Sequence, residues 1–122
     1  PEVIRYMVAR VDLALREELG IADGLADPRV HLLDPCCGTG AYVVEVLRQI
    51  AATLRAQGEE ALLGYQVKQA ALTRVFGFEL LPAPFVVAHL QVGLFLQQLE
   101  APLRDDEERA KIYLTNALTG WE

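Results

Sequence analysis

The chain reads Leu32-Leu33-Asp34-Pro35-Cys36-Cys37-Gly38-Thr39-Gly40-Ala41-Tyr42-Val43-Val44, and this stretch decides its fold. An apolar run ends at an acid and a proline, a Gly-x-Gly turn follows, and a helix begins. Glycines at 38 and 40 allow positive φ and let a ligand approach main-chain N–H groups closely. The helix then directs its unpaired N–H groups, with their partial positive charge, at the turn. The pattern predicts a strand, a tight loop and a helix N-terminus that form half of a nucleotide-type pocket.

Two better-known phosphate-binding patterns are absent from this stretch. A dinucleotide-binding loop places a third glycine three residues after the second, where this chain has Val43. Its usual acid about twenty residues further on falls on Glu59 or Glu60, inside an apparently helical stretch. A P-loop is excluded because no Gly-Lys-Ser/Thr follows. The sequence therefore favours a pocket for a nucleoside without a demanding phosphate group.

The sequence Asp34 to Gly40, followed by Val75-Phe76-Gly77-Phe78-Glu79-Leu80, resembles the S-adenosylmethionine site of adenine-specific DNA methyltransferases. It is most similar to the methylase region of large single-chain restriction-modification enzymes. The resemblance extends over nearly the whole chain, because residues 1–8 look like the preceding helix of that family and residues 114–118 look like its third-strand motif.

The resemblance implies a role for each candidate residue. In that family the first motif holds the methionine half of the cofactor, which here assigns Pro35, Gly38, Thr39 and Gly40 to that end. Asp34 either fixes the loop by accepting backbone N–H bonds or holds the ligand's ammonium group.

The acid that ends the second strand takes both ribose hydroxyls in the family, and here it is Glu79. Asn116 can pair with the edge of the cofactor's adenine, and the family often has Asp at this position. Leu80 and Leu118 would cover the adenine faces.

The family's catalytic tetrapeptide, Asn-Pro-Pro-aromatic, is not present between Pro1 and Glu122. It positions the target amine and stacks the flipped base. We therefore expect residues 1–122 to be the N-terminal, cofactor-binding part of a methyltransferase domain, with the catalytic residues beyond Glu122. The start at Pro1 also suggests a part of a longer polypeptide.

Composition fits one domain of 122 residues with 52% hydrophobic residues. No apolar run reaches membrane-spanning length and no secretory leader is present, so a cytoplasmic protein is expected. Adjacent Cys36 and Cys37 form neither a disulfide framework nor a zinc site, and His31 and His89 lack metal-ligand spacing. We interpret all four as structural residues.

The net charge of −6 and the scattered arginines and lysines give no basic face for DNA. If the protein handles DNA, the contacts must lie in regions outside this chain.

Hydrophobic periodicity predicts the order of elements. A helix should run from Pro1 to a stop at Gly20, a buried strand over 30–33, a helix over 41–57 and a further helical pattern over 59–73. A second strand follows over 74–78, a helix that starts near Pro82 and runs through 85–99, and a third strand over 110–114.

This order predicts an α/β fold, Rossmann-like and typical of S-adenosylmethionine-dependent methyltransferases. A partial three-stranded parallel sheet would carry flanking helices and right-handed crossovers. Such a sheet exposes an edge and an apolar face, so further strands or self-association are expected.

The sequence thus predicts the S-adenosylmethionine-binding portion of a DNA adenine methyltransferase. A methyltransferase acting on RNA, protein or a small molecule would share Asp34 to Gly40 and Glu79. A nucleotide-binding dehydrogenase or sensor is the remaining alternative, which Val43 disfavours.

Overall fold

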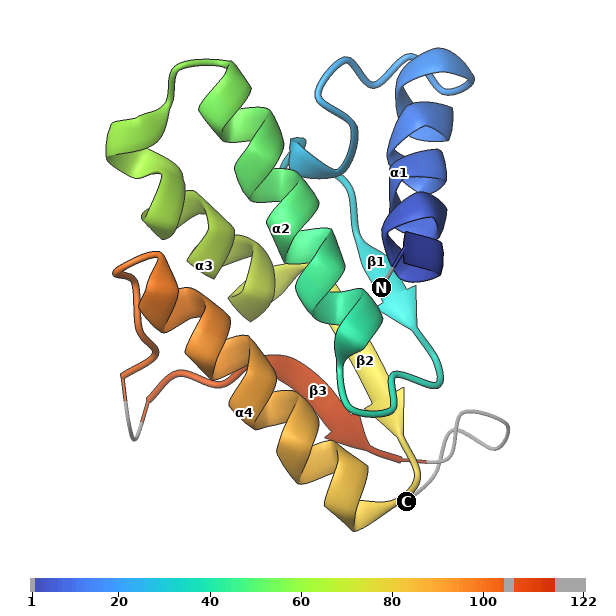
Figure 1. The fold of residues 1–122 in the computed structure, drawn as a ribbon, viewed down its shortest axis with the longest axis vertical. Helices are drawn as coiled ribbons and strands as arrows, with labels where there is room; N and C mark the ends of the chain where they lie inside the picture. Colours follow the sequence, from blue (N-terminus) through green and yellow to red (C-terminus); the bar gives the residue numbers. More distant parts are fainter. Residues whose placement is uncertain (1, 105–106, 116–122) are drawn as a thin grey trace.

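Helices and strands alternate along the chain in the computed structural model, which describes residues 2–104 and 107–115 (Figure 1). In chain order the elements are α1 (Glu2–Glu17), the 3-10 helix η1 (Gly24–Ala26), β1 (Leu32–Asp34), α2 (Ala41–Ala56), the 3-10 helix η2 (Glu60–Leu62), α3 (Leu63–Thr73), β2 (Val75–Glu79), α4 (Pro82–Gln98) and β3 (Lys111–Leu114). This order confirms the predicted α/β alternation, including the helix inserted before the second strand.

The three strands form one parallel sheet with β2 in the middle. The register pairs Asp34 with Gly77 and Glu79 with Leu114. Helices α2, α3 and α4 lie on one face of this sheet (Figure 1), as right-handed crossovers require when successive strands are added in one direction. The carboxyl ends of β1 and β2 therefore meet at one edge, where open α/β sheets bind their ligands.

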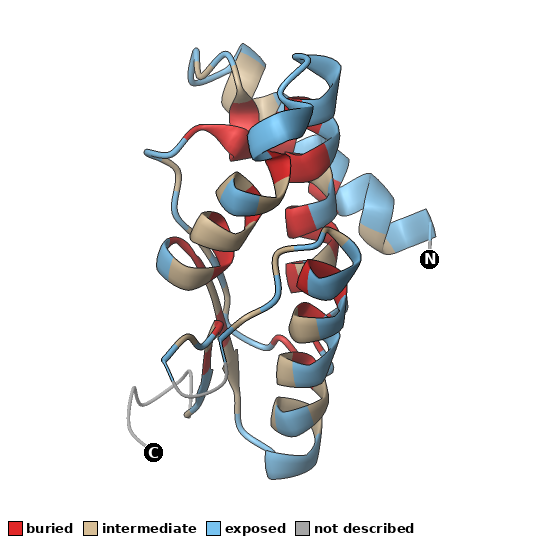
Figure 2. Ribbon diagram, turned by 90° about the vertical axis from the view of Figure 1, so that its left-hand side faces the viewer, coloured by how far each residue is buried: buried red, intermediate tan, exposed pale blue. Residues whose placement is uncertain are grey.

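The hydrophobic core lies between these helices and the sheet, where the buried residues gather (Figure 2). It forms there because each helix removes an apolar stripe from water against the sheet and its neighbours. The largest fully buried side chains are Leu25, Leu47, Ile50, Val67, Val92 and Leu96. Most of them come from α2, α3 and α4, so the helix that begins at the Gly-x-Gly turn is anchored along its length.

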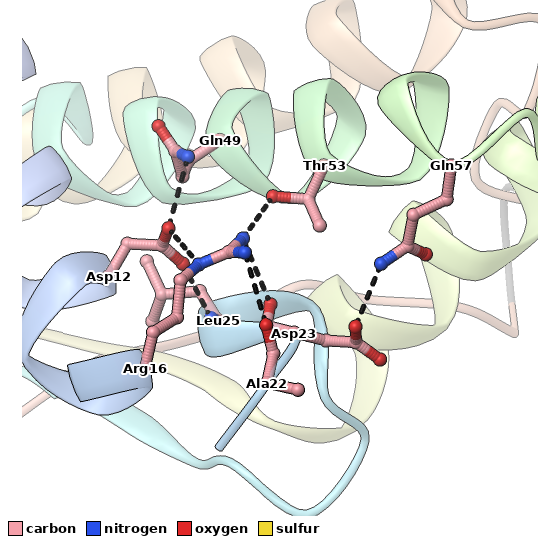
Figure 3. A network of polar contacts seen from close by, with 8 residues as sticks. All are labelled: Asp12, Arg16, Ala22, Asp23, Leu25, Gln49, Thr53 and Gln57. Carbon is pink, nitrogen blue, oxygen red and sulfur yellow. Dashed lines mark hydrogen bonds and ion pairs between the residues drawn. The ribbon is translucent and has the colours of Figure 1, made fainter. Parts of the chain in front are cut away.

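Helix α1 packs beside α2 through a partly buried polar network (Figure 3). Asp12 is buried and accepts bonds from Leu25 N (2.8 Å), Arg16 Nε (2.9 Å) and Gln49 Nε2 (3.3 Å). Arg16 Nη2 in turn donates to the Thr53 hydroxyl at 2.9 Å. The network ties α1, η1 and α2 together by satisfying groups that would be costly to bury alone.

The predicted helix is present as α1, but it ends at Glu17 and not at Gly20, and apolar spacing did not show which of its residues are buried. Among the apolar residues of α1, Val8 is buried, whereas Met7 and Val11 are exposed. Helix α1 lies beside α2 and β1 and is not sandwiched between layers (Figure 1). No described helix is both long enough and apolar enough to cross a membrane.

The first strand differs from its prediction in two respects. It begins at Leu32 and not at Val30, because Val30 N donates to Asp27 O in a turn at 3.0 Å. It was also expected to be buried on both faces, yet Leu33 is 49% exposed. The reason is that, among the described residues, helices cover only the face that carries Leu32.

Candidate functional site

The candidate site is the loop of residues 35–40, which joins β1 to α2 above the carboxyl end of β2. The loop is tied to β2 by Cys37 N, which donates to Phe78 O at 2.8 Å. It is closed on itself by Gly40 N, which donates to Cys37 O at 2.9 Å. Gly40 has a φ of 90°, a left-handed conformation that favours glycine, and helix α2 begins directly after it.

Glu79 reaches from the end of β2 to this loop. Its Oε1 atom accepts a bond from Gly38 N and its Oε2 atom accepts one from Leu81 N, both at 2.9 Å. The structure therefore brings residues 38 and 79 together, although 41 residues separate them. Glu79 therefore fixes the loop, and it lies at the carboxyl end of β2, where open α/β sheets bind ligands.

Asp34 carries an orphaned polar atom at the same edge. Its Oδ1 atom accepts a bond from Cys36 N at 3.1 Å, which is the first of the two roles that the sequence left open. Its Oδ2 atom is buried and has no hydrogen-bond partner among the described residues. Since buried carboxylate oxygens are almost always paired, this atom indicates a missing donor.

The two cysteines have different environments. Cys37 is buried and its Sγ atom lies 3.8 Å from Gly38 O, whereas Cys36 is exposed. Burial, together with the charges of Asp34 and Glu79, raises the pKa of the Cys37 thiol to about 11. Cys37 thus packs as a protonated small residue, as expected, but the packing role does not extend to Cys36.

Sequence reasoning missed the contribution of Gly77. In dinucleotide-binding folds a third glycine on the helix allows close helix–strand packing, and here the helix carries Val43 at that position. The glycine lies on the strand instead. A Cβ atom at Gly77 would be 3.0 Å from both Cys37 Cβ and Cys37 Sγ, and 3.5 Å from Val43 Cγ2. A glycine within a strand signals such a close approach, so Phe76-Gly77-Phe78 held the signal.

Three other predicted site residues, Pro35, Thr39 and Gly40, belong to the loop itself and line two cavities beside it. Thr39 and Gly40 line a cavity of about 230 Å³. Glu45 and Arg48 also line it and form an ion pair, with 2.8 Å between Arg48 Nη1 and Glu45 Oε1. Pro35 and Asp34 line a second, mainly apolar cavity of about 260 Å³ between α1 and β1.

Leu80 follows β2 and is exposed, where an adenine ring could cover it. Asn116 and Leu118 lie outside the described residues, so their predicted adenine contacts stay predictions.

The histidines are placed as structural groups. His89 Nε2 lies 3.1 Å from Ile112 O and its ring packs edge-on against Phe85, while His31 stacks on Phe76. Burial lowers the pKa of His89, and the charge of Arg109 lowers it further. Within residues 2–104 and 107–115, no group of histidine, cysteine and acidic side chains could hold a metal ion.

No protein-family model matches this sequence, and no curated protein does either. Solved structures do match. A nuclease-deletion mutant of the Type ISP restriction-modification enzyme LlaGI, in complex with a DNA substrate mimic, has a TM-score of 0.80 at 22% identity, covering 97% of this chain and 9% of that chain. The ATP-dependent Type ISP restriction-modification enzyme LlaBIII, bound to DNA, has a TM-score of 0.76 at 26% identity, covering 94% of this chain and 7% of that chain.

A modification subunit assigned to a type I restriction enzyme from Vibrio vulnificus YJ016 has a TM-score of 0.54 at 24% identity, covering 95% of this chain and 18% of that chain. The chain therefore spans less than a fifth of the length of these proteins. Its α/β fold, with a three-stranded parallel sheet and flanking helices, is similar to segments of restriction-modification enzymes.

Proposed function

We propose that this chain is the S-adenosylmethionine-binding part of a DNA adenine methyltransferase within a restriction-modification enzyme. The observation that carries the proposal is the buried Asp34 Oδ2 atom, which has no hydrogen-bond partner among the described residues and lies beside a loop that Glu79 holds in place. An ammonium group, such as that of the methionine end of the cofactor, supplies the donor that this oxygen lacks. The Rossmann-like methyltransferase fold is part of the same proposal.

The residues present also fit a ribose. Each Glu79 oxygen accepts one backbone N–H bond, and a carboxylate offers about four lone-pair sites, so each oxygen keeps acceptor capacity. Two vicinal hydroxyl groups match two such oxygens. The exposed Leu80 side chain next to Glu79 offers an apolar surface for the attached base.

When bound, the cofactor supplies an electrophilic methyl group on a sulfonium sulfur. The chain's own residues would bind and orient the cofactor. Asp34 would hold the ammonium group, Glu79 would hold the ribose, and the α2 N-terminus would face the carboxylate through its free N–H groups. Cys37, with its pKa near 11, stays a thiol at neutral pH and so does not compete as a thiolate for the methyl group.

DNA is the proposed substrate because LlaGI, LlaBIII and a third similar structure, DrdV, are each described as a DNA complex. Adenine specificity rests on the resemblance of Asp34 to Gly40 and of residues 75–80 to the adenine-methylating family. With a net charge of −6, this chain is proposed to leave most phosphate contacts to other regions.

The binding test uses the full-length protein that carries this sequence. Calorimetric titration should show binding of S-adenosylhomocysteine and none of NAD. Asp34→Asn should weaken S-adenosylhomocysteine binding by about tenfold, because a hydrogen bond to a charged group contributes about 1.5–3 kcal/mol. The matched control is Asp23→Asn, because the Asp23 carboxylate accepts a bond from Gln57 at an exposed site. Binding of NAD in place of S-adenosylhomocysteine would replace the proposal with the dehydrogenase or sensor alternative.

The substrate test follows labelled methyl groups from S-adenosylmethionine. Transfer to duplex DNA, with the label recovered as N6-methyladenine after digestion, is the expected result. Transfer to RNA, protein or a small molecule, with none to DNA, would support the broader methyltransferase alternative and overturn the proposed substrate.

A further inference from the structure

Helix α4 approaches the last residue of the Gly-x-Gly turn at Ala88. Both Gly40 and Ala88 are buried, and Ala88 is fully so. A Cβ atom at Gly40 would lie 3.1 Å from Ala88 Cα, 3.2 Å from Ala88 Cβ and 3.5 Å from Ala88 O. The two backbones therefore touch with no room for a further heavy atom between them.

The rest of α4 is fixed to the sheet beside this contact. His89, the next residue, meets Ile112 O in the middle of β3 through its Nε2 atom at 3.1 Å. Its ring also packs against Phe85, one turn earlier, with 4.8 Å between ring centroids. Since α4 is held on that side, extra volume at residue 88 would press against the turn at Gly40.

Movement of Gly40 would reach the methionine end of the site more than the ribose end. Gly40 N closes the loop onto Cys37 O, and α2 begins at Ala41, so both the loop and the α2 N-terminus would shift. The ribose-binding carboxylate meets the loop only through Glu79 Oε1, at Gly38 N, and it has a second anchor outside the loop, because Leu81 N holds Glu79 Oε2.

We infer that Ala88 is a positioning residue. It sets the distance between the loop and α4, and through this distance the affinity for the amino-acid end of S-adenosylmethionine. This inference rests on the proposed function. Ala88 lies outside the motifs that the sequence resemblance covers, and it acts through Gly40 without touching the cofactor. Its small size is the property that matters, because only a methyl group fits against the turn.

The test compares two ligands on the full-length protein by calorimetry. S-adenosylhomocysteine carries the amino-acid end, whereas 5′-methylthioadenosine has the same nucleoside and sulfur without it. In Ala88→Val, S-adenosylhomocysteine affinity should fall by at least about tenfold while 5′-methylthioadenosine affinity stays within about twofold, a difference of over about 1 kcal/mol in binding free energy.

Ala70→Val is the matched control, since Ala70 is equally buried on α3 and is remote from the turn. It adds the same volume to the core and should leave both affinities unchanged. Ala88→Ser adds a single heavy atom and should give a smaller loss of S-adenosylhomocysteine affinity, about threefold. It decides the case if Ala88→Val does not fold.

Equal losses for both ligands, or no loss in either Ala88 variant, would overturn the positioning role. Failure of the unmodified protein to bind S-adenosylhomocysteine would instead overturn the proposed function, so the two failures are distinguishable.

Discussion

Glu79 combines two tasks in one side chain. It holds the loop through Gly38 N and is proposed to bind a ribose with its remaining lone pairs. We expect Glu79→Ala to weaken S-adenosylhomocysteine binding by at least about tenfold, because charged hydrogen bonds contribute about 1.5–3 kcal/mol each. Glu79→Gln keeps one acceptor oxygen and should lose less. Calorimetry measures both, with circular dichroism as the folding control; full affinity in folded Glu79→Ala would remove the ribose assignment.

His89 makes stability depend on pH near neutrality. Burial lowers its pKa below the ordinary value of 6.5, so the unfolded chain binds a proton more readily than the folded chain. Its contribution to stability is full above pH 6.5 and is lost as the pH falls through 6.5 toward the lowered folded pKa. Denaturation midpoints from pH 7.5 to 5.5 should fall in the unmodified protein and fall less in His89→Gln.

The same substitution at His31, an exposed residue that stacks on Phe76, is the control. His31→Gln should leave the pH dependence in place. An identical slope in the His89→Gln and unmodified proteins would contradict the assignment to His89.

At the scale of elements, the packing of α1 against α2, here called the seam, depends on the buried carboxylate of Asp12. Asp12→Ala leaves the buried Leu25 N–H group and the Arg16 guanidinium without their shared partner. We expect a loss of about 2–3 kcal/mol in the free energy of unfolding, because an unsatisfied buried donor costs about 1–3 kcal/mol and a charged group more. Arg16 is about one-third exposed, which keeps the loss below that of a fully buried pair.

Asp23 provides the matched comparison within the same network (Figure 3). Its carboxylate accepts one exposed bond from Gln57, so Asp23→Ala should change the free energy of unfolding by less than about 0.5 kcal/mol. Chemical denaturation measures both variants. Equal effects at the two positions would show that burial of Asp12 does not govern the seam.

At the scale of the whole molecule, the sheet is covered on one face only among the described residues. The other face presents Leu33, Phe76, Phe78 and Tyr113, with Phe78 and Tyr113 packed edge to face. Leu33 and Tyr113 are 49% and 44% exposed. Apolar surface of this kind, beside open strand edges, favours association.

We therefore expect the 122-residue chain to self-associate at high protein concentration in light-scattering measurements. Leu33→Thr together with Tyr113→Thr should reduce the association, because the pair makes the open face less apolar while placing threonine, a β-branched residue that favours strands, at both positions. Val3→Thr, on the exposed side of α1, should not. A monomer at all concentrations in the unmodified chain would contradict the prediction.

The sequence by itself determined the order of elements, the loop of residues 35–40 and the position of Glu79 at the end of β2. These features follow from local signals: apolar periodicity, glycine and proline at turns, and an acid directly after a strand. The boundaries of β1 and the buried face of α1 were not determined in this way, because both depend on which layers cover those elements.

Only the tertiary structure decided how the loop is held. The contact of Ala88 with Gly40, the fit of Cys37 against Gly77 and the burial of Asp12 join residues far apart in the chain. A glycine within a strand signals a close approach, but the sequence does not identify the partner of this glycine, of the alanine or of the aspartate. The packing of α4 and α2 against the sheet determines which of them touch, since close-packed interiors leave no space for alternatives.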